Sequence, residues 1–212
     1  MIASISDYLR AVGSLDDSSR IFRYHLAMIA VHGADSSFAL GWRNKHDQQV
    51  RFKTLAGIAD LNGKTVMDAG CGYADLYLFL KEHNPQIRHY YGIEQITELA
   101  DEAVGRYGHL SDTTFITRSF LHGDLPVCDY VLASGSLNYG STVNGFIYQA
   151  IERLYSHCTI GLGFNLLRYM PADGTLVAYD PEDIQAFCKT LSPNVVVKID
   201  YDEADFSIFI YR

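Results

Sequence analysis

Residues 66–76, VMDAGCGYADL, join a short apolar run to an acid, two glycines one residue apart and a second acid. The apolar residues that lead to Asp68 predict a strand, and the residues from Asp75 onward predict a helix. Gly70 and Gly72 therefore fall in a strand-to-helix turn. Glycine permits tight backbone geometry there and lets a ligand approach without obstruction from a Cβ atom. We expect a ligand site at this turn.

The pattern around this turn predicts an α/β fold. Strands are expected at 64–69, 89–95, 113–119, 128–136 and 158–167, helices at 74–83, 96–108, 143–157 and 181–191, and a final antiparallel pair of strands at 194–201 and 205–212. Parallel strands need crossover connections, so this alternation indicates a parallel sheet covered on both faces. Ligands bind such sheets outside the carboxyl ends of the strands, where the strand order reverses.

The first 61 residues have a helical pattern instead. Apolar residues recur at three- and four-residue spacing over 4–14, 18–33 and 44–63, with polar starts and glycine stops. We predict an N-terminal helical cap over residues 1–61, forming a lid or side layer, and a ligand-binding core over residues 62–212.

Composition narrows the class of protein. The 212 residues include 48% hydrophobic and 20% charged residues, with a net charge of -8 and no block of basic residues, which disfavours nucleic-acid binding. No apolar run is long enough to span a membrane, and the start does not resemble a secretion signal. The four cysteines and eight histidines are scattered, without metal-ligand spacing, so we expect free thiols, no metal and a cytoplasmic location.

The acids near the glycine turn indicate the charge of the ligand. Asp75 stands where a dinucleotide fingerprint would have a third small residue, and Asp68 precedes the first glycine, so a diphosphate would be repelled. Glu94 ends the strand HYYGIE, about 20 residues beyond the glycines, where a carboxylate accepts both hydroxyls of a ribose. A cationic adenosyl compound, S-adenosylmethionine, satisfies both features.

Three segments resemble a known family. VMDAGCGYADL, YYGIEQ and CDYVLASGSLNYG are similar to the first, second and fourth motifs of class I S-adenosylmethionine-dependent methyltransferases, over roughly residues 62–212. The resemblance implies a three-layer Rossmann-like sandwich with a seven-stranded, mostly parallel sheet and an antiparallel last strand. It also implies that Asp68, Gly70, Gly72 and Glu94 bind the cofactor.

The same resemblance suggests further cofactor-binding residues. They are Gln95 in the second motif, Ser119 and Phe120 after the third strand, Ser134 after the fourth, and Arg51. Residues 32–55 resemble the preamble of a bacterial subgroup, marked here by Trp42, Gln48, Arg51 and Phe52. Arg51 is expected to pair with the methionyl carboxylate, although a solvated charge is an equally good interpretation.

The segment 134–140, SGSLNYG, is expected at the reactive end of the cofactor, with Asn138 and Tyr139 as catalytic candidates. Methyltransferases that act on amines of nucleic acids or proteins often carry an N-P-P-[YF] motif here. This segment lacks its prolines, which disfavours the amine of a nucleic-acid base or a glutamine amide as acceptor. Asn165 and the tyrosines of the loop 169–180 are further candidates for the substrate wall. His122 and Asp124 are weighed as a base and its orienting partner.

We therefore predict an S-adenosylmethionine-dependent methyltransferase that acts on a small-molecule acceptor. Three alternatives remain open. The same pocket could cyclise the aminobutyrate part of the cofactor and release methylthioadenosine, the protein could bind the cofactor or a partner without catalysis, or it could be an NAD-dependent oxidoreductase. The sequence does not indicate an oligomeric state.

Overall fold

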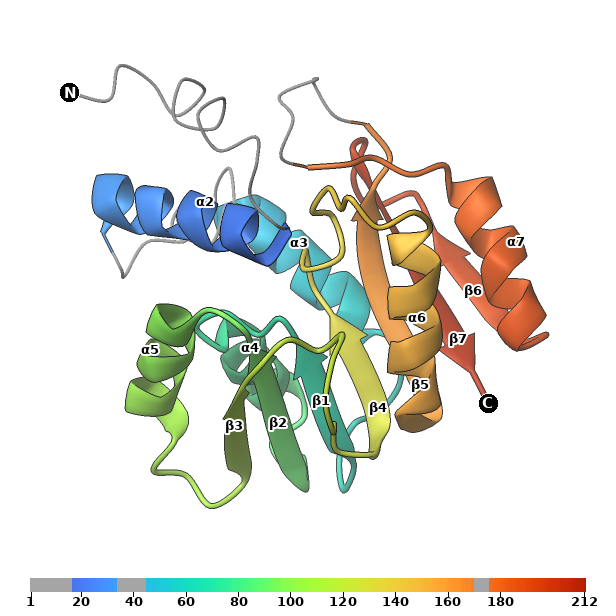
Figure 1. The fold of residues 1–212 in the computed structure, drawn as a ribbon. Helices are drawn as coiled ribbons and strands as arrows, with labels where there is room; N and C mark the ends of the chain where they lie inside the picture. Colours follow the sequence, from blue (N-terminus) through green and yellow to red (C-terminus); the bar gives the residue numbers. More distant parts are fainter. Residues whose placement is uncertain (1–16, 34–44, 170–175) are drawn as a thin grey trace.

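The computed structural model describes residues 17–33, 45–169 and 176–212 (Figure 1). Its elements follow in the order α2 (Asp17–His32), α3 (Lys45–Ala56), β1 (Thr65–Ala69), α4 (Asp75–His83), β2 (His89–Glu94), α5 (Thr97–Tyr107), β3 (Thr113–Thr117), β4 (Cys128–Ala133), α6 (Phe146–Ser156), β5 (Cys158–Leu167), α7 (Pro181–Leu191), β6 (Val195–Lys198) and β7 (Asp205–Tyr211).

The strands form one seven-stranded sheet in the order β3-β2-β1-β4-β5-β7-β6. Strands β1 to β5 pair in parallel, whereas β7 is antiparallel to both β5 and β6. The predicted sheet with an antiparallel last strand is confirmed. The strand order reverses between β1 and β4, which is where such sheets bind their ligands.

Helices cover both faces of the sheet, because its strands are apolar on both sides. Val66 of β1 packs with residues of α3, α4 and α5, and its neighbour Met67 packs with residues of α6 and α7 on the other face. This alternation follows from the two-residue period of a strand. The result is the predicted three-layer sandwich.

Helix α2 lies across the carboxyl end of the sheet (Figure 1). Ile21 and Ile29 of α2 pack against Tyr73, Ile96 and Leu99, which belong to the turn after β1 and to the start of α5. The predicted lid is therefore formed by α2.

Helix α3 instead belongs to one face of the sheet, since Phe52 and Leu55 share a core with Leu132 of β4 and Phe209 of β7. It is shorter than the predicted 44–63, because the chain turns from Gly57, with Asn62 donating its backbone N–H to Asp60 at 3.0 Å. The division into units at residue 61 stays a prediction.

Two predictions, the helix at 4–14 and the role of Trp42, lie outside the described residues. Within the described part of the chain, no helix combines the length and the apolar character needed to cross a bilayer.

Candidate functional site

A cavity of about 530 Å³ opens at the carboxyl ends of β1, β2 and β4, where residues of α2 also line it. The predicted cofactor-binding and catalytic residues all line it. These are Arg51, Asp68, Gly70, Gly72, Glu94, Gln95, Ser119, Phe120, Ser134, Asn138 and Tyr139. The structure thus brings together residues from the first half of the predicted core, between Asp68 and Tyr139, and one from α3, around a space of the size that small ligands occupy.

The backbone conformation of the turn after β1 favours glycine at positions 70 and 72. Gly70 and Gly72 have φ values of +80° and +54°, which favour glycine. A Cβ atom added to Gly70 would lie 2.4 Å from Cβ of Ser136, in the turn after β4. The carboxylate of Glu94 accepts the backbone N–H of Gly72 at 2.9 Å, which ties the end of β2 to this turn.

Asp68 is the most buried acid in the cavity wall, with 1% of its surface exposed. Its Oδ2 accepts a hydrogen bond from the Tyr90 hydroxyl at 2.6 Å, while its Oδ1 has no hydrogen-bond partner among the described residues. Burial, opposed by the bond from Tyr90 and reinforced by the charges of Glu94 and Asp75, raises the pKa of Asp68 from 3.8 to about 7. A buried carboxylate oxygen without a partner is costly, and a cationic ligand would satisfy it.

Glu94 is also buried and accepts two backbone N–H groups, from Gly72 and from Ile96 at 2.9 Å each. Burial raises the pKa of Glu94, and the backbone donors at Ile96, Gly72 and Gln95 oppose that rise. A carboxylate has about four acceptor positions. Glu94 can therefore accept hydroxyls from a ligand while it holds the glycine turn.

Asp75 was expected to repel a diphosphate together with Asp68, but its charge is partly offset in the structure. Its carboxylate accepts hydrogen bonds from Gln48 at 2.9 Å and from Arg106 at 3.2 Å, and Arg106 offsets its charge. The negative charge facing the cavity therefore comes mainly from Asp68 and Glu94.

Arg51 lines the cavity and makes a buried two-point ion pair with Asp205 of β7, at 2.5 and 2.8 Å. Such a pair fixes the plane of a guanidinium group. Its predicted pairing with the cofactor carboxylate stays a prediction. Asp205 was not expected from the sequence.

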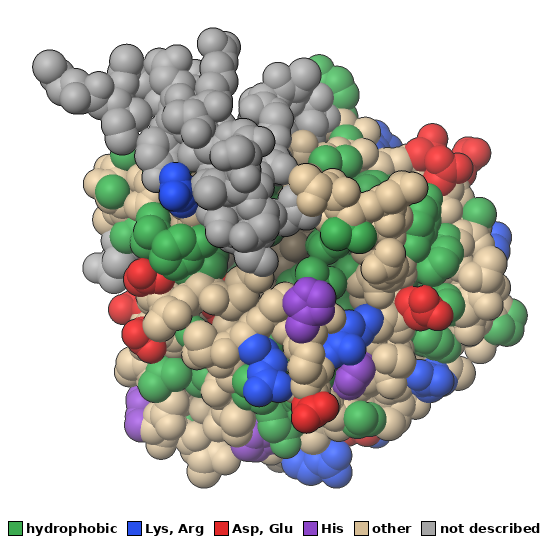
Figure 2. Space-filling model, in the orientation of Figure 1, with side chains coloured by type: hydrophobic (Ala, Val, Ile, Leu, Met, Phe, Trp, Pro, Cys, Tyr) green, Lys and Arg blue, Asp and Glu red, His purple; other side chains and the backbone are tan. Residues whose placement is uncertain are grey.

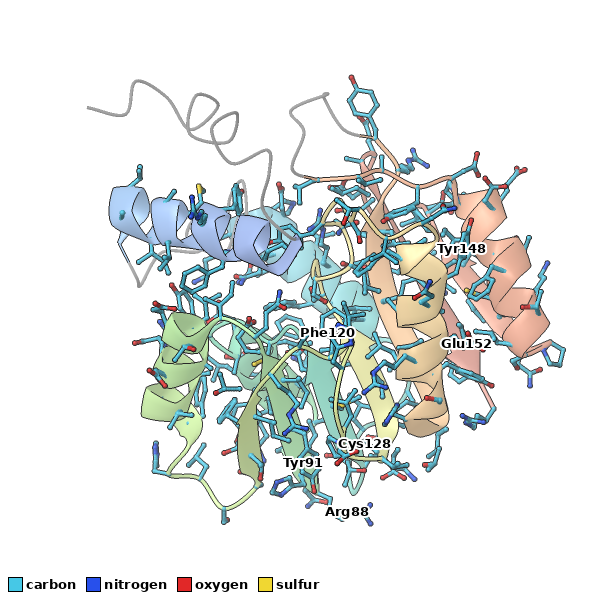
Figure 3. All side chains as sticks on the ribbon, viewed as in Figure 1. Arg88, Tyr91, Phe120, Cys128, Tyr148 and Glu152 are labelled. Carbon is cyan, nitrogen blue, oxygen red and sulfur yellow. The ribbon has the colours of Figure 1, made fainter. Side chains whose placement is uncertain are left out.

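The loop after β3 is fixed by an arginine of α6. Arg153 donates to the carbonyl oxygen of Phe120 at 2.8 Å and also to the carbonyl of Gly123. Phe120 lies at the carboxyl end of the sheet, whereas Arg88 and Cys128 lie toward the opposite end (Figure 3). Ser119 and Phe120 thus form a braced wall of the cavity.

Asn138 uses its polar groups to hold the turn after β4 in place. Its Oδ1 accepts the backbone N–H of Leu167 at 2.8 Å, its Nδ2 donates to Gly135 at 3.4 Å, and its backbone carbonyl accepts from Val177 at 2.7 Å. Asn165 braces the same turn, accepting the N–H of Gly135 at 2.8 Å. These bonds hold the backbone beside Tyr139.

Tyr139 meets a residue that sequence reasoning missed. Its hydroxyl lies 2.6 Å from Nε2 of His25, on α2. Tyr24 packs edge-on against both rings, with centroids 5.2 Å from His25 and 6.4 Å from Tyr139. A signal was present, because His25 follows Ile21 by four residues on the inward face of an amphipathic helix.

Some candidates are not brought to the cavity. Tyr169 is 69% exposed, and both it and Arg168 line a shallow hollow outside the cavity. The structure shows no hydrogen bond between the side chains of His122 and Asp124, both of which are described, and Asp124 points to solvent.

The surface charges, the possible metal ligands and the cysteines add no further site among the described residues. On the face in Figure 2, basic side chains are interspersed with acidic, histidine and apolar ones. Among the described residues no group of three or more His, Cys, Asp or Glu side chains is arranged to hold a metal ion. The four cysteines are buried free thiols.

Comparisons with known proteins agree on the fold. No protein-family model and no curated protein matches the sequence. Solved structures do match. Magnesium protoporphyrin IX methyltransferase from Synechocystis, with bound S-adenosylmethionine, is 18% identical with a TM-score of 0.66, and the match covers 94% of this chain and 98% of that one.

Human N-acetylserotonin methyltransferase, also in complex with S-adenosylmethionine, is 16% identical with a TM-score of 0.61, over 98% of this chain and 70% of that one. An O-methyltransferase family protein from Burkholderia thailandensis is 12% identical with a TM-score of 0.64, over 92% of this chain and 60% of that one. The chain therefore has the fold of class I S-adenosylmethionine-dependent methyltransferases.

Proposed function

We propose that this protein binds S-adenosylmethionine and transfers its methyl group to a small-molecule acceptor. The observation that carries the proposal is the buried Asp68 carboxylate, whose Oδ1 has no partner among the described residues and which lines a cavity at the strand-order reversal. The neighbouring structures named above are methyltransferases, two of them with this compound bound. The location and the charge of the cavity both favour a cationic adenosyl ligand.

The residues present fit the compound. Asp68 would accept from its ammonium group and Glu94 from its ribose hydroxyls, while Gly70 leaves room beside Ser136 that a Cβ atom would fill. Arg51, paired with Asp205, lines the cavity from the α3 side, and we assign it to the carboxylate. When bound, S-adenosylmethionine supplies an electrophilic methyl group on a sulfonium sulfur.

The chain's own residues then align the acceptor and exclude water. Helix α2 covers the cavity with Ile21, Tyr24 and His25, and Tyr139 faces them from the turn after β4. Methyl transfer needs an aligned nucleophile more than a specialised catalytic group. We therefore assign Tyr139 to the acceptor side and Asn138 to the support of its backbone.

The acceptor is proposed to be a small molecule because the cavity is enclosed by α2 and the net charge of the chain is -8. Absence of a nucleic-acid partner and a cytoplasmic location stay predictions. Cyclisation of the cofactor gains no support, since the neighbouring structures named above are methyltransferases.

Ligand-dependent thermal unfolding tests the proposal. The protein is heated with S-adenosylmethionine, S-adenosylhomocysteine, NAD or buffer alone. A ligand at a hundred times its dissociation constant adds about 2.7 kcal/mol to the free energy of unfolding, so both adenosyl compounds are expected to raise the Tm. Stabilisation by NAD alone would overturn the proposal.

The acids provide the sharper test. Asp68→Asn and Glu94→Gln are each expected to weaken S-adenosylhomocysteine binding at least about tenfold in calorimetry, because each loses a charged hydrogen bond to the ligand. Glu152→Gln is the matched control, since Glu152 is exposed on α6 and lies outside the cavity wall (Figure 3). Equal binding by all three variants would contradict the assignment. The nucleoside product separates the two reactions, because methyl transfer leaves S-adenosylhomocysteine and cyclisation leaves methylthioadenosine.

A further inference from the structure

The contact between His25 and Tyr139 joins the lid to the sheet inside the cavity. His25 is 5% exposed, and its Nε2 lies 2.6 Å from the Tyr139 hydroxyl. Tyr139 is fixed from behind, because its backbone forms a bridge to Leu176 and the preceding carbonyl accepts the N–H of Val177. The pair is thus held from two elements.

The pair shares its cavity with the proposed methyl-donor site. Asp68 and Glu94 line the floor of the same cavity, and Tyr139 is close enough to Glu94 to feel its charge. Ile21, Leu167 and Leu176 supply apolar surface around the pair. An acceptor that reaches the donor methyl group from the lid side would therefore meet this polar pair with apolar side chains in the same wall.

The two side chains have different acid-base properties. Burial, with smaller effects of Tyr24 and Glu94, raises the pKa of Tyr139 above its ordinary value, so its phenol stays protonated at neutral pH. An imidazole has an unperturbed pKa of about 6.5 and can take a proton near neutrality. Tyr139 is therefore suited to pass a proton on, and His25 to keep it.

Other ionisable groups of the cavity wall are already engaged or belong to the donor site. They are Tyr24 on α2, Asp68 after β1, Glu94 after β2, Asp75 paired with Arg106, Arg51 paired with Asp205, Arg153 bound to backbone carbonyls, Cys71 in the glycine turn, and His122 at the exposed rim.

We propose that His25, with Tyr139 as relay, takes the proton from a hydroxyl group of the acceptor, which makes the acceptor an alcohol or phenol with an apolar body. This rests on the proposed methyl transfer. The acceptor oxygen forms a bond to the methyl carbon, and the carbon–sulfur bond breaks with its electron pair left on sulfur. The acceptor proton moves to Tyr139 Oη as the phenol proton moves to His25 Nε2.

Other nucleophiles fit this couple less well. A carboxylate would be repelled by Asp68 and Glu94, and it has no proton to lose. A thiol is a weak hydrogen-bond donor and is already nucleophilic near neutral pH. An alkylammonium would approach a sulfonium of like charge. A hydroxyl needs the base and is a strong donor to Tyr139.

Three matched probes test the acceptor class. The protein is incubated with trideuteromethyl S-adenosylmethionine and, separately, 1-naphthol, 1-naphthylamine or 1-naphthalenethiol, and the labelled products are measured by mass spectrometry. These probes share one apolar ring system and differ in the nucleophilic atom. We expect transfer to the naphthol oxygen, with a rate that rises as the pH passes through the titration of an imidazole.

The variants test the two residues. His25→Gln keeps a polar group beside Tyr139 but does not titrate, so the naphthol rate should fall about 100-fold and lose its pH dependence. Tyr139→Phe keeps the ring and removes the relay, and should lower kcat by a similar factor. Both should bind S-adenosylhomocysteine within twofold of the unmodified protein. His109→Gln, an exposed histidine outside the cavity wall, is the control.

Failures at the two levels are distinguishable. If S-adenosylhomocysteine does not bind the unmodified protein, the proposed function itself falls. If it binds and naphthol is not methylated, or only the amine or the thiol is, the hydroxyl assignment is overturned. An unchanged pH profile in His25→Gln, with Tyr139→Phe fully active, would overturn the role of the pair.

Discussion

Asp68 is a residue whose charge depends on what lies beside it. Its pKa of about 7 in the protein alone reflects burial, which the bond from Tyr90 only partly opposes and which Glu94 and Asp75 reinforce. A bound ammonium group would favour the carboxylate form and lower that pKa. Ligand binding should therefore release a proton below pH 7 and become weaker as the pH falls.

The expected result is a dissociation constant for S-adenosylhomocysteine about tenfold larger at pH 6 than at pH 8, measured by calorimetry. Two controls isolate the cause. Asp68→Asn should remove the dependence, and 5′-methylthioadenosine, which lacks the ammonium group, should not show it. A tenfold effect that persists in Asp68→Asn would assign it to another group.

The raised pKa of Asp68 has the opposite effect on the stability of the protein without ligand. Between about pH 4 and 7 the native state holds a proton on Asp68 that the unfolded chain has released. The free energy of unfolding from this group therefore falls as the pH rises through that window. The site carries a cost at neutral pH that a cationic ligand offsets.

At the scale of elements, two helices on opposite faces of the sheet each send an arginine to the cavity. Arg51 comes from α3 and pairs with Asp205, while Arg153 comes from α6 and holds the carbonyls of the 119–123 loop. The two should serve different parts of an adenosyl ligand. We expect Arg51 to face the amino-acid part of the ligand, and the 119–123 loop to face its adenine base.

Two ligands separate these roles. Replacing the ion pair by Arg51→Met with Asp205→Leu should weaken S-adenosylhomocysteine about tenfold and leave 5′-methylthioadenosine within twofold, because only the first ligand has a carboxylate. Arg153→Met should weaken both ligands by a similar factor, since both contain adenine. Calorimetry measures each, and equal losses for both ligands in the double variant would contradict the role of Arg51.

Element boundaries were predictable where local chemistry decides them. Pro181 begins α7, as the predicted helix 181–191 indicates, and Asp180 caps it by accepting the N–H of Glu182 at 2.7 Å. The end of α3 at Ala56 was not predicted, because the apolar spacing continues through Ile58 and Leu61 although the backbone has already turned. Apolar spacing reports burial, and here both residues are buried outside a helix.

At the scale of the whole molecule, the alternation of strands and helices along the sequence predicted the architecture. The floor of the cavity was predicted from two acids and two glycines that are close in sequence. The long-range pairs did not. His25 and Tyr139 are 114 residues apart, and Arg51 and Asp205 are 154 apart. A single sequence shows which face of a helix is buried, but it carries no information on which distant residue meets that face.

The parts of the molecule should differ in local stability. The central strands are paired on both sides, whereas apolar residues such as Ile21 and Ile29 hold α2 on the turn after β1 and on the start of α5. Local opening is easiest where few apolar contacts hold an element. We expect amide hydrogens of α2 to exchange at least about tenfold faster than those of β4, by mass spectrometry.

Binding of S-adenosylhomocysteine should slow exchange in α2 more than in β4, because the proposed ligand site lies between the helix and the sheet. The edge strand β6 provides an internal reference, since it is distant from the cavity wall. Exchange in α2 as slow as in β4, with or without ligand, would show that the lid is a fixed part of the core.

The lid and the floor of the cavity come from separate stretches of chain. Substitutions in α2 reshape one wall of the chamber and leave the bonds among Gly72, Glu94 and Ile96 intact. Under the proposed function, substitutions in one helix could therefore change the acceptor while the residues proposed to bind the adenosyl compound stay the same.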